Sequence, residues 1–516
     1  MSDWLKELQA RREHALGMGG EERISKQHGR GKKTVRERID LLCDQGSFQE
    51  YGLLASHQGE HGVAQDVNEV TPSDGVVFGI GDIDGRLACV VGEDFTVKGG
   101  TYGQIHGLKK RRALELALKD HIPIVWVLDG AGARAQEMIG EGLPYGVNYL
   151  MMAKLSGIAP QVGVVMGPSA GDSSLIASSC EFVIMVEGTS MLAAGGPPIV
   201  KAATGQDISK EELGGSSIHC RVSGVADNAV ATEAEAIALT KRYLSYLPGN
   251  AWEYPPQAAT DDPVERVSND LLDIVPDDSR RPYDMHDIIN RVFDLDSFLE
   301  IKPQHAQSII TGFARMDGHP VGIVANQPTV AAGSITTQAA RKARHFIDLC
   351  SAYHVPLVFL QDVPGVMPGP ESEREGALRA GLSLAYALAW ADVPTITVII
   401  RKSFGYGACA MAGGGSGQSV VLAWPGADFG SLPPSSAVLA AHGKELEAAE
   451  DPDALRDQLM DNYKQCSGAF HAARTFSVDD VVDPRETRLR VAKALQLARR
   501  RRTQAAQPTP RFGVMP

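Results

Sequence analysis

The chain has 516 residues and a formal net charge of -13, and 43% of its residues are hydrophobic while 22% are charged. This composition is typical of a folded protein of two to four domains and excludes wholesale disorder. The acidic balance argues against a nucleic-acid-binding protein. No run approaches the roughly 18 apolar residues of a membrane span, and the mixed charges of MSDWLKELQARREH exclude a targeting peptide. Seven scattered cysteines without a C-x-x-C pair favour a cytoplasmic protein with reduced thiols.

Apolar runs of strand length alternate with longer helical segments along the chain. Four continuous runs rich in β-branched residues are typical of buried strands: 122–128, 162–166, 355–360 and 394–400. Helical patterns precede the first and the last of these runs, at 108–120 and 376–391. Strands that alternate with helices in this way predict an α/β architecture.

An internal repeat divides the chain into two similar halves. Residues 79–104 resemble residues 312–337, and the same offset of 233 positions continues through strand, loop and helix. The matched pairs are Asp84 with Asp317, Gly100 with Gly333, His121 with His354, and Asp129 with Asp362. We therefore expect two domains of similar fold. The predicted division is a helical arm at 1–34, a first domain at 35–245, a linker at 246–284, a second domain at 285–490, and a solvated basic tail at 491–516.

Each half carries two glycine-rich loops after apolar strands. They lie at 129–134 and 167–174 in the first half, and at 362–369 and 401–411 in the second. Because ligands gather at the carboxyl ends of strands in open sheets, these four loops form the candidate site. Their glycines leave backbone N–H groups accessible, and such donors stabilise developing oxyanions in acyl and enolate chemistry. A purely structural role in turns is the alternative for these glycines.

Three other kinds of site fit the sequence poorly. The segment GPSAG matches the G-x-S-x-G elbow of serine hydrolases with Ser169 as nucleophile, but its counterpart at 403–405 lacks the leading glycine. The segment AGGGSGQS at 412–419 is not followed by the Lys-Ser/Thr pair of a phosphate-binding P-loop. The 14 histidines form no H-x-H or H-E-x-x-H cluster, so we predict no metal site.

Several longer segments resemble one known family. They are EDFTVKGGTYGQIHG (93–107), DGAGARAQE (129–137), EELGGSSIHCRVSGVAD (211–227), VANQP (324–328) and QDVPGVMPG (361–369). On these segments the chain resembles the carboxyltransferase (β) subunit of biotin-dependent acyl-CoA carboxylases, nearest the propionyl-CoA carboxylase branch, over residues 29–488. The resemblance implies two tandem crotonase-like (ClpP/crotonase) domains, in agreement with the internal repeat. It also implies a homo-oligomer, commonly a hexamer, with sites between the first domain of one chain and the second domain of its partner.

The resemblance also implies the reaction. A carboxyl group moves from carboxybiotin to the α-carbon of an acyl-CoA through an enolate, whose oxygen needs fixed hydrogen-bond donors. The family's donors for the thioester match the amides of Gly171 and Asp172, and its donors for biotin match those of Tyr406 and Gly407. No side chain is demanded for proton transfer, because the freed biotin can take the proton.

Residues that bind coenzyme A and biotin follow from the same resemblance. We expect coenzyme A on the first domain, against the segment 132–134, with Lys32 and Arg36 as candidates for its phosphates because Lys and Arg match phosphate oxygens. The alternative for Lys32 and Arg36 is the solvated start of a helix. The predicted cofactor-binding residues are Lys32, Arg36, Gly100, Gly132, Ala133, Arg134, Gly365 and Cys409.

Three residues depart from the family pattern. Asp172 stands where the family usually has a second glycine, and Tyr406 where it has a small residue. Cys409 stands where the propionyl-type enzymes carry an acidic residue that shapes the acyl pocket. A carboxylate at position 172 would repel a developing enolate unless it points away or is paired. We expect the Asp172 side chain to cap the following helix; the alternative is a site whose chemistry has changed.

The chain has neither a Met-Lys-Met biotinylation site nor an ATP-grasp glycine loop. The resemblance therefore implies a biotin carboxylase and biotin carboxyl carrier (α) subunit as partner, besides acyl-CoA and further copies of this chain. Neither a nucleic acid nor a membrane is expected as a partner. Two alternatives stay open. One is a component of a biotin-dependent acyl-CoA decarboxylase, which runs the transfer backwards. The other is a catalytically weak paralogue that serves as a scaffold in a carboxylase complex.

Overall fold

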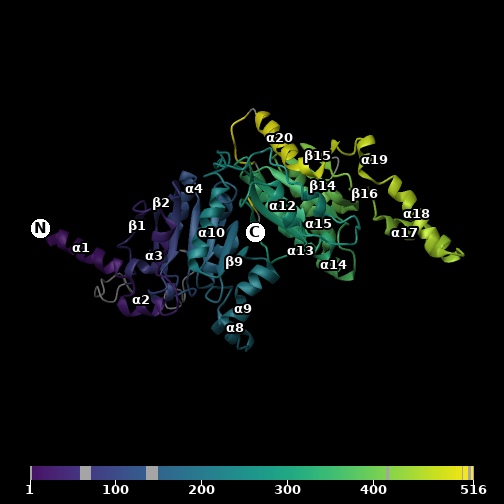
Figure 1. Ribbon diagram of the computed structural model, residues 1–516. Helices are drawn as coiled ribbons and strands as arrows, with labels where there is room; N and C mark the ends of the chain where they lie inside the picture. Colours follow the sequence, from purple (N-terminus) through teal and green to yellow (C-terminus); the bar gives the residue numbers. More distant parts are fainter. Residues whose placement is uncertain are drawn as a thin grey trace. The chain divides into compact units, whose positions relative to one another are not determined.

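The computed structural model describes residues 3–57, 71–134, 149–413, 418–502, 504–509 and 513–514. Parts of two segments named above, 135–137 and 414–417, lie outside the described residues. The chain divides into two compact units (Figure 1): unit 1 is Met1–Glu253 with Pro508–Pro516, and unit 2 is Tyr254–Gln507. Within the described ranges, no helix is long and apolar enough to cross a membrane.

Unit 1 is built on a mixed sheet that has seven strands in the part of the chain that the structure describes. In spatial order they are β1 (Gln49–Tyr51), β2 (Val76–Ile83), β3 (Arg86–Glu93), β4 (Ile124–Leu128), β5 (Gln161–Val165), β7 (Phe182–Val186) and β9 (Asn228–Val230). The first three pair antiparallel, and the pairing is parallel from β3 onward. Every residue of β4, β5 and β7 is buried, which explains their continuous apolar sequences.

Helices cover both faces of this sheet. A Cβ added at Gly92 of β3 would lie 2.4 Å from Val35 Cγ2, which belongs to α3 (Val35–Leu42). Three positions earlier, the Cys89 thiol donates to the carbonyl of Ala113 in α4 (Gln104–Asp120) at 3.8 Å. Side chains alternate between faces along a strand, so α3 and α4 lie on opposite faces. Helix α10 (Glu233–Ser245) packs beside α3, and α6 (Tyr149–Leu155) packs between α4 and α7 (Asp172–Ser179).

Further elements of unit 1 are α1 (Asp3–Leu16), α2 (Glu21–His28), β6 (Pro168–Ala170), β8 (Met191–Ala193), α8 (Pro197–Thr204) and α9 (Lys210–Gly214). The first two form the helical arm expected at the N-terminus. The amide of Gly19, between them, donates to Thr96 Oγ1 at 3.0 Å. The arm therefore packs on unit 1.

Unit 2 repeats the mixed sheet. In spatial order its strands are β10 (Leu299–Ile301), β11 (Ile309–Met316), β12 (His319–Asn326), β13 (Leu357–Val363), β14 (Thr395–Phe404), β15 (Val420–Ala423) and β17 (Asp480–Val481), and β16 (Asp428–Gly430) pairs with β14. The first three are again antiparallel and the others parallel. All four predicted strands are therefore confirmed, as β4, β5, β13 and β14.

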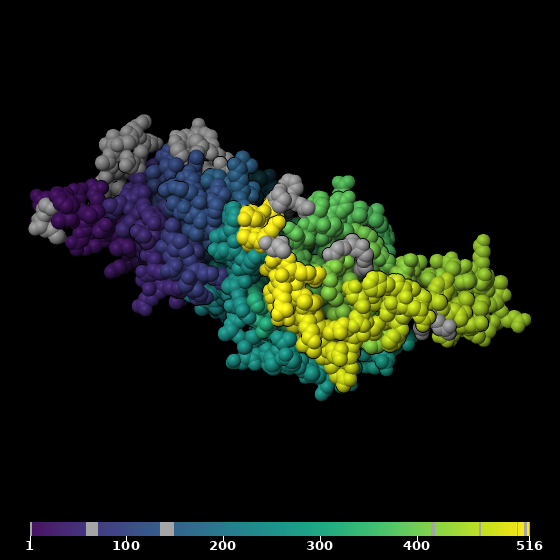
Figure 2. All heavy atoms as spheres, turned by 90° about the horizontal axis from the view of Figure 1, so that it is seen from above, coloured from purple at the N-terminus to yellow at the C-terminus, as the bar shows by residue number. Residues whose placement is uncertain are grey.

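Unit 2 also has helices on both faces of its sheet. On one face, Ile289 of α12 (Met285–Val292) and Leu495 of α20 (Thr487–Arg500) share a buried cluster with Ile323 of β12. On the other face, Phe346 of α13 (Thr337–Ala352) contacts Phe313 of β11 at a ring-centroid distance of 5.0 Å, and α15 (Ala377–Trp390) packs against α13. Further helices are α11 (Leu271–Ile274), α14 (Pro370–Glu375), α16 (Gly405–Ala410), α17 (Pro434–Ala448), α18 (Pro452–Gln465) and α19 (Ala469–Arg474). Helices α17 and α18 extend away from the sheet of unit 2 (Figures 1 and 2).

The two units share unusual backbone conformations at the positions that the repeat pairs. Tyr102 forms a parallel bridge with Ala133 in unit 1, and Ile335, 233 positions later, forms one with Val366 in unit 2. Matched residues also share the left-handed conformation: φ is 48° and 58° at Asp84 and Asp317, 62° and 79° at Gly100 and Gly333, and 52° and 59° at His121 and His354. The internal repeat is thus confirmed down to single turns.

The structure divides the chain differently from the predicted boundaries near its C-terminus. Helix α20 continues through the boundary predicted at 490/491, because Val491 and Leu495 are buried in the core of unit 2. The expected solvated tail is also wrong in part. The Arg502 guanidinium lies 4.1 Å from the centroid of the Tyr254 ring, and Ser156 Oγ donates to the carbonyl of Val514 at 3.1 Å. Arg502 and Val514, which are described residues of this segment, therefore pack on the protein instead of lying free in solvent.

One histidine at the start of α12 gives unit 2 a pH-dependent stability. The hydrogen bond from His286 to Glu300, at 2.9 Å, and the Asp284 carboxylate at 2.7 Å raise the pKa of His286 from 6.5 to about 9. A raised pKa means that the folded state binds the His286 proton more tightly than the unfolded state does. The resulting contribution to the free energy of unfolding is complete below pH 6.5 and is lost as the pH rises through 9.

We expect the free energy of unfolding of unit 2 to fall by about 1 kcal/mol between pH 6.5 and 9, after allowing for solvent screening at a third-exposed side chain. His286→Gln should remove this part of the pH dependence. Urea titrations at pH 6, 7.5 and 9 measure the difference between the variant and the wild-type protein. If the free energy of unfolding changes with pH in the same way in both proteins, His286 is not the source of the pH dependence.

Candidate active site

Two loops come together at the carboxyl ends of β4 and β5 in unit 1. The loop 129–134 follows β4, and β6 leads into Gly171 before α7. The amide of Ala170 donates to the carbonyl of Gly130 at 3.3 Å, and a Cβ added at Gly132 would lie 3.9 Å from Ala170 Cβ. The predicted loops of the first half therefore lie side by side.

Gly171 directs the amides at the start of α7. Its φ of 59° and ψ of -119° form a conformation that glycine adopts and other residues avoid. The Gly171 amide itself donates to the carbonyl of Ala193 at 3.2 Å. Asp172 and Ser173 lie in the first turn, where amides have no acceptor inside the helix. Of the two predicted thioester donors, the Asp172 amide makes no hydrogen bond within the described part of the chain, while the Gly171 amide has a long hydrogen bond that a ligand would have to replace.

The side chain of Asp172 is paired. Its Oδ2 accepts from the Lys110 ammonium at 3.0 Å, and its Oδ1 accepts from the Tyr149 hydroxyl at 2.9 Å. Helix α7 begins without a hydrogen bond from any capping side chain. The expectation that Asp172 caps this helix is therefore wrong, because a buried cation offers its carboxylate a stronger partner than the first-turn amides do.

Sequence reasoning missed two residues that hold this region together. Glu93, at the end of β3, accepts from Lys110 Nζ at 2.6 Å, from Ser173 Oγ at 2.6 Å and from the amide of Asp129 at 2.8 Å. Its repeat counterpart Asn326 accepts from the amide of Asp362 at 3.2 Å. The offset of the repeat could have identified Glu93, but no sequence signal points to Lys110.

Asp129 follows β4 and is fully buried beside two cations, Lys32 between α2 and α3 and Arg38 of α3. Lys32 Nζ lies 2.6 Å from one of its oxygens, and Arg38 Nη1 lies 2.9 Å away. Arg38 also binds Glu233 on α10, with 2.5 Å between Nη2 and Oε1. Burial lowers the pKa of Lys32 more than Asp129 raises it. Lys32 therefore has an internal partner that a coenzyme A phosphate would have to displace, and its role in phosphate binding stays a prediction.

Two other predicted cations are also bound within unit 1. Arg36 Nη1 lies 2.7 Å from Glu50, and Arg134 Nη1 lies 2.8 Å from Asp74. Gly100 is constrained by packing, because a Cβ there would lie 2.4 Å from the carbonyl oxygen of Asp129. The structure thus brings Gly100 and the loop 129–134 together, but it directs the charges of Arg36 and Arg134 toward carboxylates of the protein.

The corresponding loops of unit 2 approach each other more closely. A Cβ on Gly407 would lie 2.8 Å from Gly365 Cα, so residue 407 must be a glycine for this contact. Gly405 has a φ of 58°, matching Gly171. Tyr406 and Gly407 lie in the first turn of α16, where amides have no helical acceptor. The amides of Tyr406 and Gly407 therefore have no partner within their own helix, and their role as donors to biotin stays a prediction.

The two side chains that depart from the family pattern in unit 2 lie at the surface of that unit. The Tyr406 hydroxyl donates to the carbonyl of Gly381 at 2.9 Å, which fixes its ring against α15, and 41% of the residue is exposed. Cys409 is exposed and makes no disulfide. Asp362, near the end of the neighbouring strand β13, is bound by Arg401 at 3.1 Å. Unit 2 therefore binds Asp362 with cations of β14, whereas in unit 1 Lys32 and Arg38 bind Asp129.

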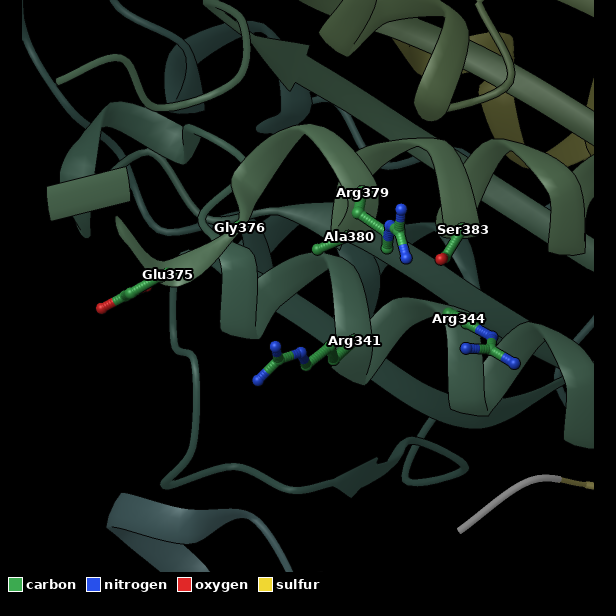
Figure 3. Close-up of a pocket in the computed structure, with 7 residues that line it drawn as sticks. All are labelled: Arg341, Arg344, Glu375, Gly376, Arg379, Ala380 and Ser383. Carbon is green, nitrogen blue, oxygen red and sulfur yellow. The ribbon is translucent and has the colours of Figure 1, made fainter. Parts of the chain in front are cut away.

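A separate cavity of about 340 Å³ lies on the helical face of unit 2 (Figure 3). It is lined by Arg341, Arg344, Glu375, Gly376, Arg379, Ala380 and Ser383 from α13, α14 and α15. Arg344 Nε lies 3.5 Å from Asp348 on the same helix. Three guanidinium groups around one cavity favour anionic groups such as phosphate or carboxylate. The sequence did not indicate this cavity, because its arginines come from two helices.

Comparisons with known proteins agree with this geometry. The carboxyl transferase domain model matches residues 26–515. The propionyl-CoA carboxylase carboxyltransferase subunit of Haloferax mediterranei is 40% identical over 517 residues, which cover 100% of this chain and 99% of the relative. The methylmalonyl-CoA decarboxylase subunit alpha of Veillonella parvula is 38% identical over 95% of this chain and 94% of the relative.

A solved structure of transcarboxylase 12S, described as a hexamer with methylmalonyl-coenzyme A bound, superposes with a TM-score of 0.91. It is 36% identical and covers 99% of this chain and 98% of that chain. Two similar α/β units, paired glycine turns at the strand ends and full-length relatives lead to one assignment. The chain belongs to the carboxyl transferase family.

Proposed function

We propose that the chain is the carboxyltransferase subunit of a biotin-dependent acyl-CoA carboxylase, which transfers a carboxyl group from carboxybiotin to the α-carbon of an acyl-CoA. The observation that carries this proposal is that both units have the same glycine turn before or at the start of a helix. A glycine with φ of 59° or 58° precedes or begins a short helix after the sheet in each unit, at Gly171 and Gly405. Such turns present amides to an anionic oxygen, and carboxyl transfer creates two such oxygens, one on each substrate.

In this proposal unit 1 binds the thioester. The first-turn amides of α7, beginning with Asp172, donate to the thioester oxygen as the α-proton leaves and negative charge builds up there. The loop 129–134 lies against Ala170 and forms the opposite wall. Gly132 and Ala133 in this loop are the proposed contacts of coenzyme A. Arg134 supports the loop through its ion pair with Asp74.

Unit 2 binds biotin in the same manner. Biotin fits this unit because a Cβ on Gly365 would meet no atom within 4 Å. The backbone at Gly365, beside Gly407, is therefore open to a ligand. Biotin supplies the carboxyl group and accepts a proton after transfer. The amides of Tyr406 and Gly407 donate to the ureido oxygen, where charge develops when the carboxyl group departs. Exposed Cys409 is the proposed contact for the acyl chain.

The biotin is carried by a separate biotin carboxylase and biotin carboxyl carrier subunit. Copies of this chain assemble as a hexamer, which is the assembly of the solved transcarboxylase 12S. A second candidate function is the reverse reaction within an acyl-CoA decarboxylase. The relative from Veillonella parvula favours this candidate. The two functions share every donor described above and differ in the direction of transfer.

Transfer from a carboxylated biotin carrier to a panel of acyl-CoA thioesters tests the function. With isotopically labelled carboxybiotin, we expect label to appear in at least one of acetyl-, propionyl-, butyryl-, branched- and long-chain acyl-CoA. The chain alone should hydrolyse no ATP and bind no avidin. Label that moves only from a carboxylated acyl-CoA to biotin would favour the decarboxylase. Absence of transfer in both directions with a cognate carrier would exclude both functions.

A further inference from the structure

Lys110 lies at the centre of a buried charge cluster beside the thioester donors. The side chain is fully buried on α4, with its ammonium 2.6 Å from Glu93 of β3 and 3.0 Å from Asp172 of α7. Glu93 is tied in turn to Ser173, the next residue of α7. One ammonium therefore joins three elements at the point where α7 begins.

Lys110 is protonated in this cluster. Burial by itself lowers the pKa of Lys110, but the carboxylates of Glu93 and Asp172 outweigh burial and raise its pKa above 10.5. Asp172 in turn has its second oxygen bound by the Tyr149 hydroxyl. Both oxygens of the carboxylate next to the donor amide thus accept hydrogen bonds, and Lys110 shares its one positive charge between Asp172 and Glu93.

We infer that Lys110 is a positioning residue for carboxyl transfer: its ammonium offsets the charge of the Asp172 carboxylate and holds the first turn of α7 so that the Asp172 amide can serve an enolate. This inference rests on the proposed function. An unpaired carboxylate on the residue that donates the amide would oppose the developing negative charge. The ion pair removes that opposition, so the site keeps its chemistry although a carboxylate replaces the family's glycine.

Unit 2 provides an internal comparison. The residue 233 positions after Lys110 is Ala343, and the counterpart of Asp172 is Tyr406, whose hydroxyl donates to the carbonyl of Gly381 at 2.9 Å. Neither counterpart is charged. Where no carboxylate accompanies the donor amides, the position of α13 that matches Lys110 holds no cation, as a compensating pair requires.

The neighbouring Lys109 is a matched control. It is also buried on α4, but its ammonium donates to backbone carbonyls, at 3.0 Å to Ser73 and 2.5 Å to Val76. Lys342, its repeat counterpart, donates to the carbonyls of Lys302, His305 and Ile309. This lysine therefore has the same structural task in both units, whereas the Lys110 pair occurs in unit 1 alone among the described residues.

Four variants test the inference in the complete enzyme with its biotin carrier. Lys110→Met and Lys110→Gln should each lower kcat about tenfold with a smaller change in KM, because the developing charge is opposed in the transition state. Adding Asp172→Gly to Lys110→Met should restore kcat at least about threefold, since it removes the unpaired carboxylate. Lys109→Met should reduce thermal stability while kcat stays within about twofold.

A wild-type kcat in Lys110→Gln would overturn the inference, because glutamine keeps a donor but not the charge. Failure of Asp172→Gly to restore kcat in the Lys110→Met background would also overturn it. If the wild-type protein transfers no carboxyl group, the proposed function fails instead. The pairing itself is then tested by unfolding free energies, in which Asp172→Gly should recover part of the stability lost in Lys110→Met.

Discussion

Replacing Gly171 with valine is expected to lower kcat for carboxyl transfer at least about a hundredfold. The φ of 59° and ψ of -119° at Gly171 are strained for any residue with a Cβ, and most strained for a β-branched one. Relief of this strain rotates the peptide that joins Gly171 to Asp172 and turns the Asp172 amide away from the thioester oxygen. Steady-state kinetics with the preferred acyl-CoA and carboxylated carrier measure the loss.

Gly188 provides the control for strain alone. It has a φ of 69° in the same unit, and a Cβ there also meets no atom within 4 Å. Gly188→Val should therefore cost a similar amount of stability, about 1–3 kcal/mol, with kcat nearly preserved. Equal loss of kcat in both variants would show that backbone strain, and not the direction of an amide, limits the reaction.

Replacing Arg38 with leucine is expected to destabilise unit 1 by about 3–5 kcal/mol. The Arg38 guanidinium is 1% exposed and lies 2.9 Å from Asp129 and 2.5 Å from Glu233. Its loss leaves Glu233 buried with the amide of Lys33, at 3.0 Å, as its remaining donor among the described residues, while Asp129 keeps Lys32. A buried carboxylate without its cation costs far more than the pair contributed when intact.

Hydrogen exchange locates this effect, because amides of β3 and β4 should lose protection while those of β12 and β13 keep theirs. The control is Arg11→Leu, which removes an exposed ion pair with Glu7 on α1 at 2.6 Å. Exposed helical pairs contribute about 0.3–0.5 kcal/mol, so this variant should unfold almost as the wild type does. A comparably small effect in Arg38→Leu would mean that solvent or another cation reaches Glu233.

Asp172 shows where inference from a family pattern stops. The sequence identified it as a departure and gave two accounts, a helix cap or altered chemistry, since only its neighbours in the chain were visible. The structure adds a third arrangement, because Lys110, 62 positions earlier, reaches its carboxylate. This pairing weakens the case for an inactive scaffold, which rested in part on an unpaired charge at the thioester site.

Lys32, Arg36 and Arg134 illustrate the same limit for binding residues. Each lies in a segment that the family resemblance marked, and each carries a charge that suits phosphate. Packing places a carboxylate within 2.8 Å of each one. Which cation remains available to a ligand depends on distances between segments up to 97 positions apart, and no local pattern encodes those distances.

The sequence by itself determined the α/β architecture, the duplication and the four loops at the strand ends. These features depend on local patterns: continuous apolar strands, glycines where φ is positive, and one offset that repeats through both halves. The tertiary structure alone decided which charged side chains form ion pairs inside the protein. It also decided that the Gly171 amide donates to the carbonyl of Ala193, and that Lys110 and Glu93 support α7. Burial sets these choices, because a desolvated charge must take the partner that packing brings within hydrogen-bond distance, wherever that partner lies in the chain.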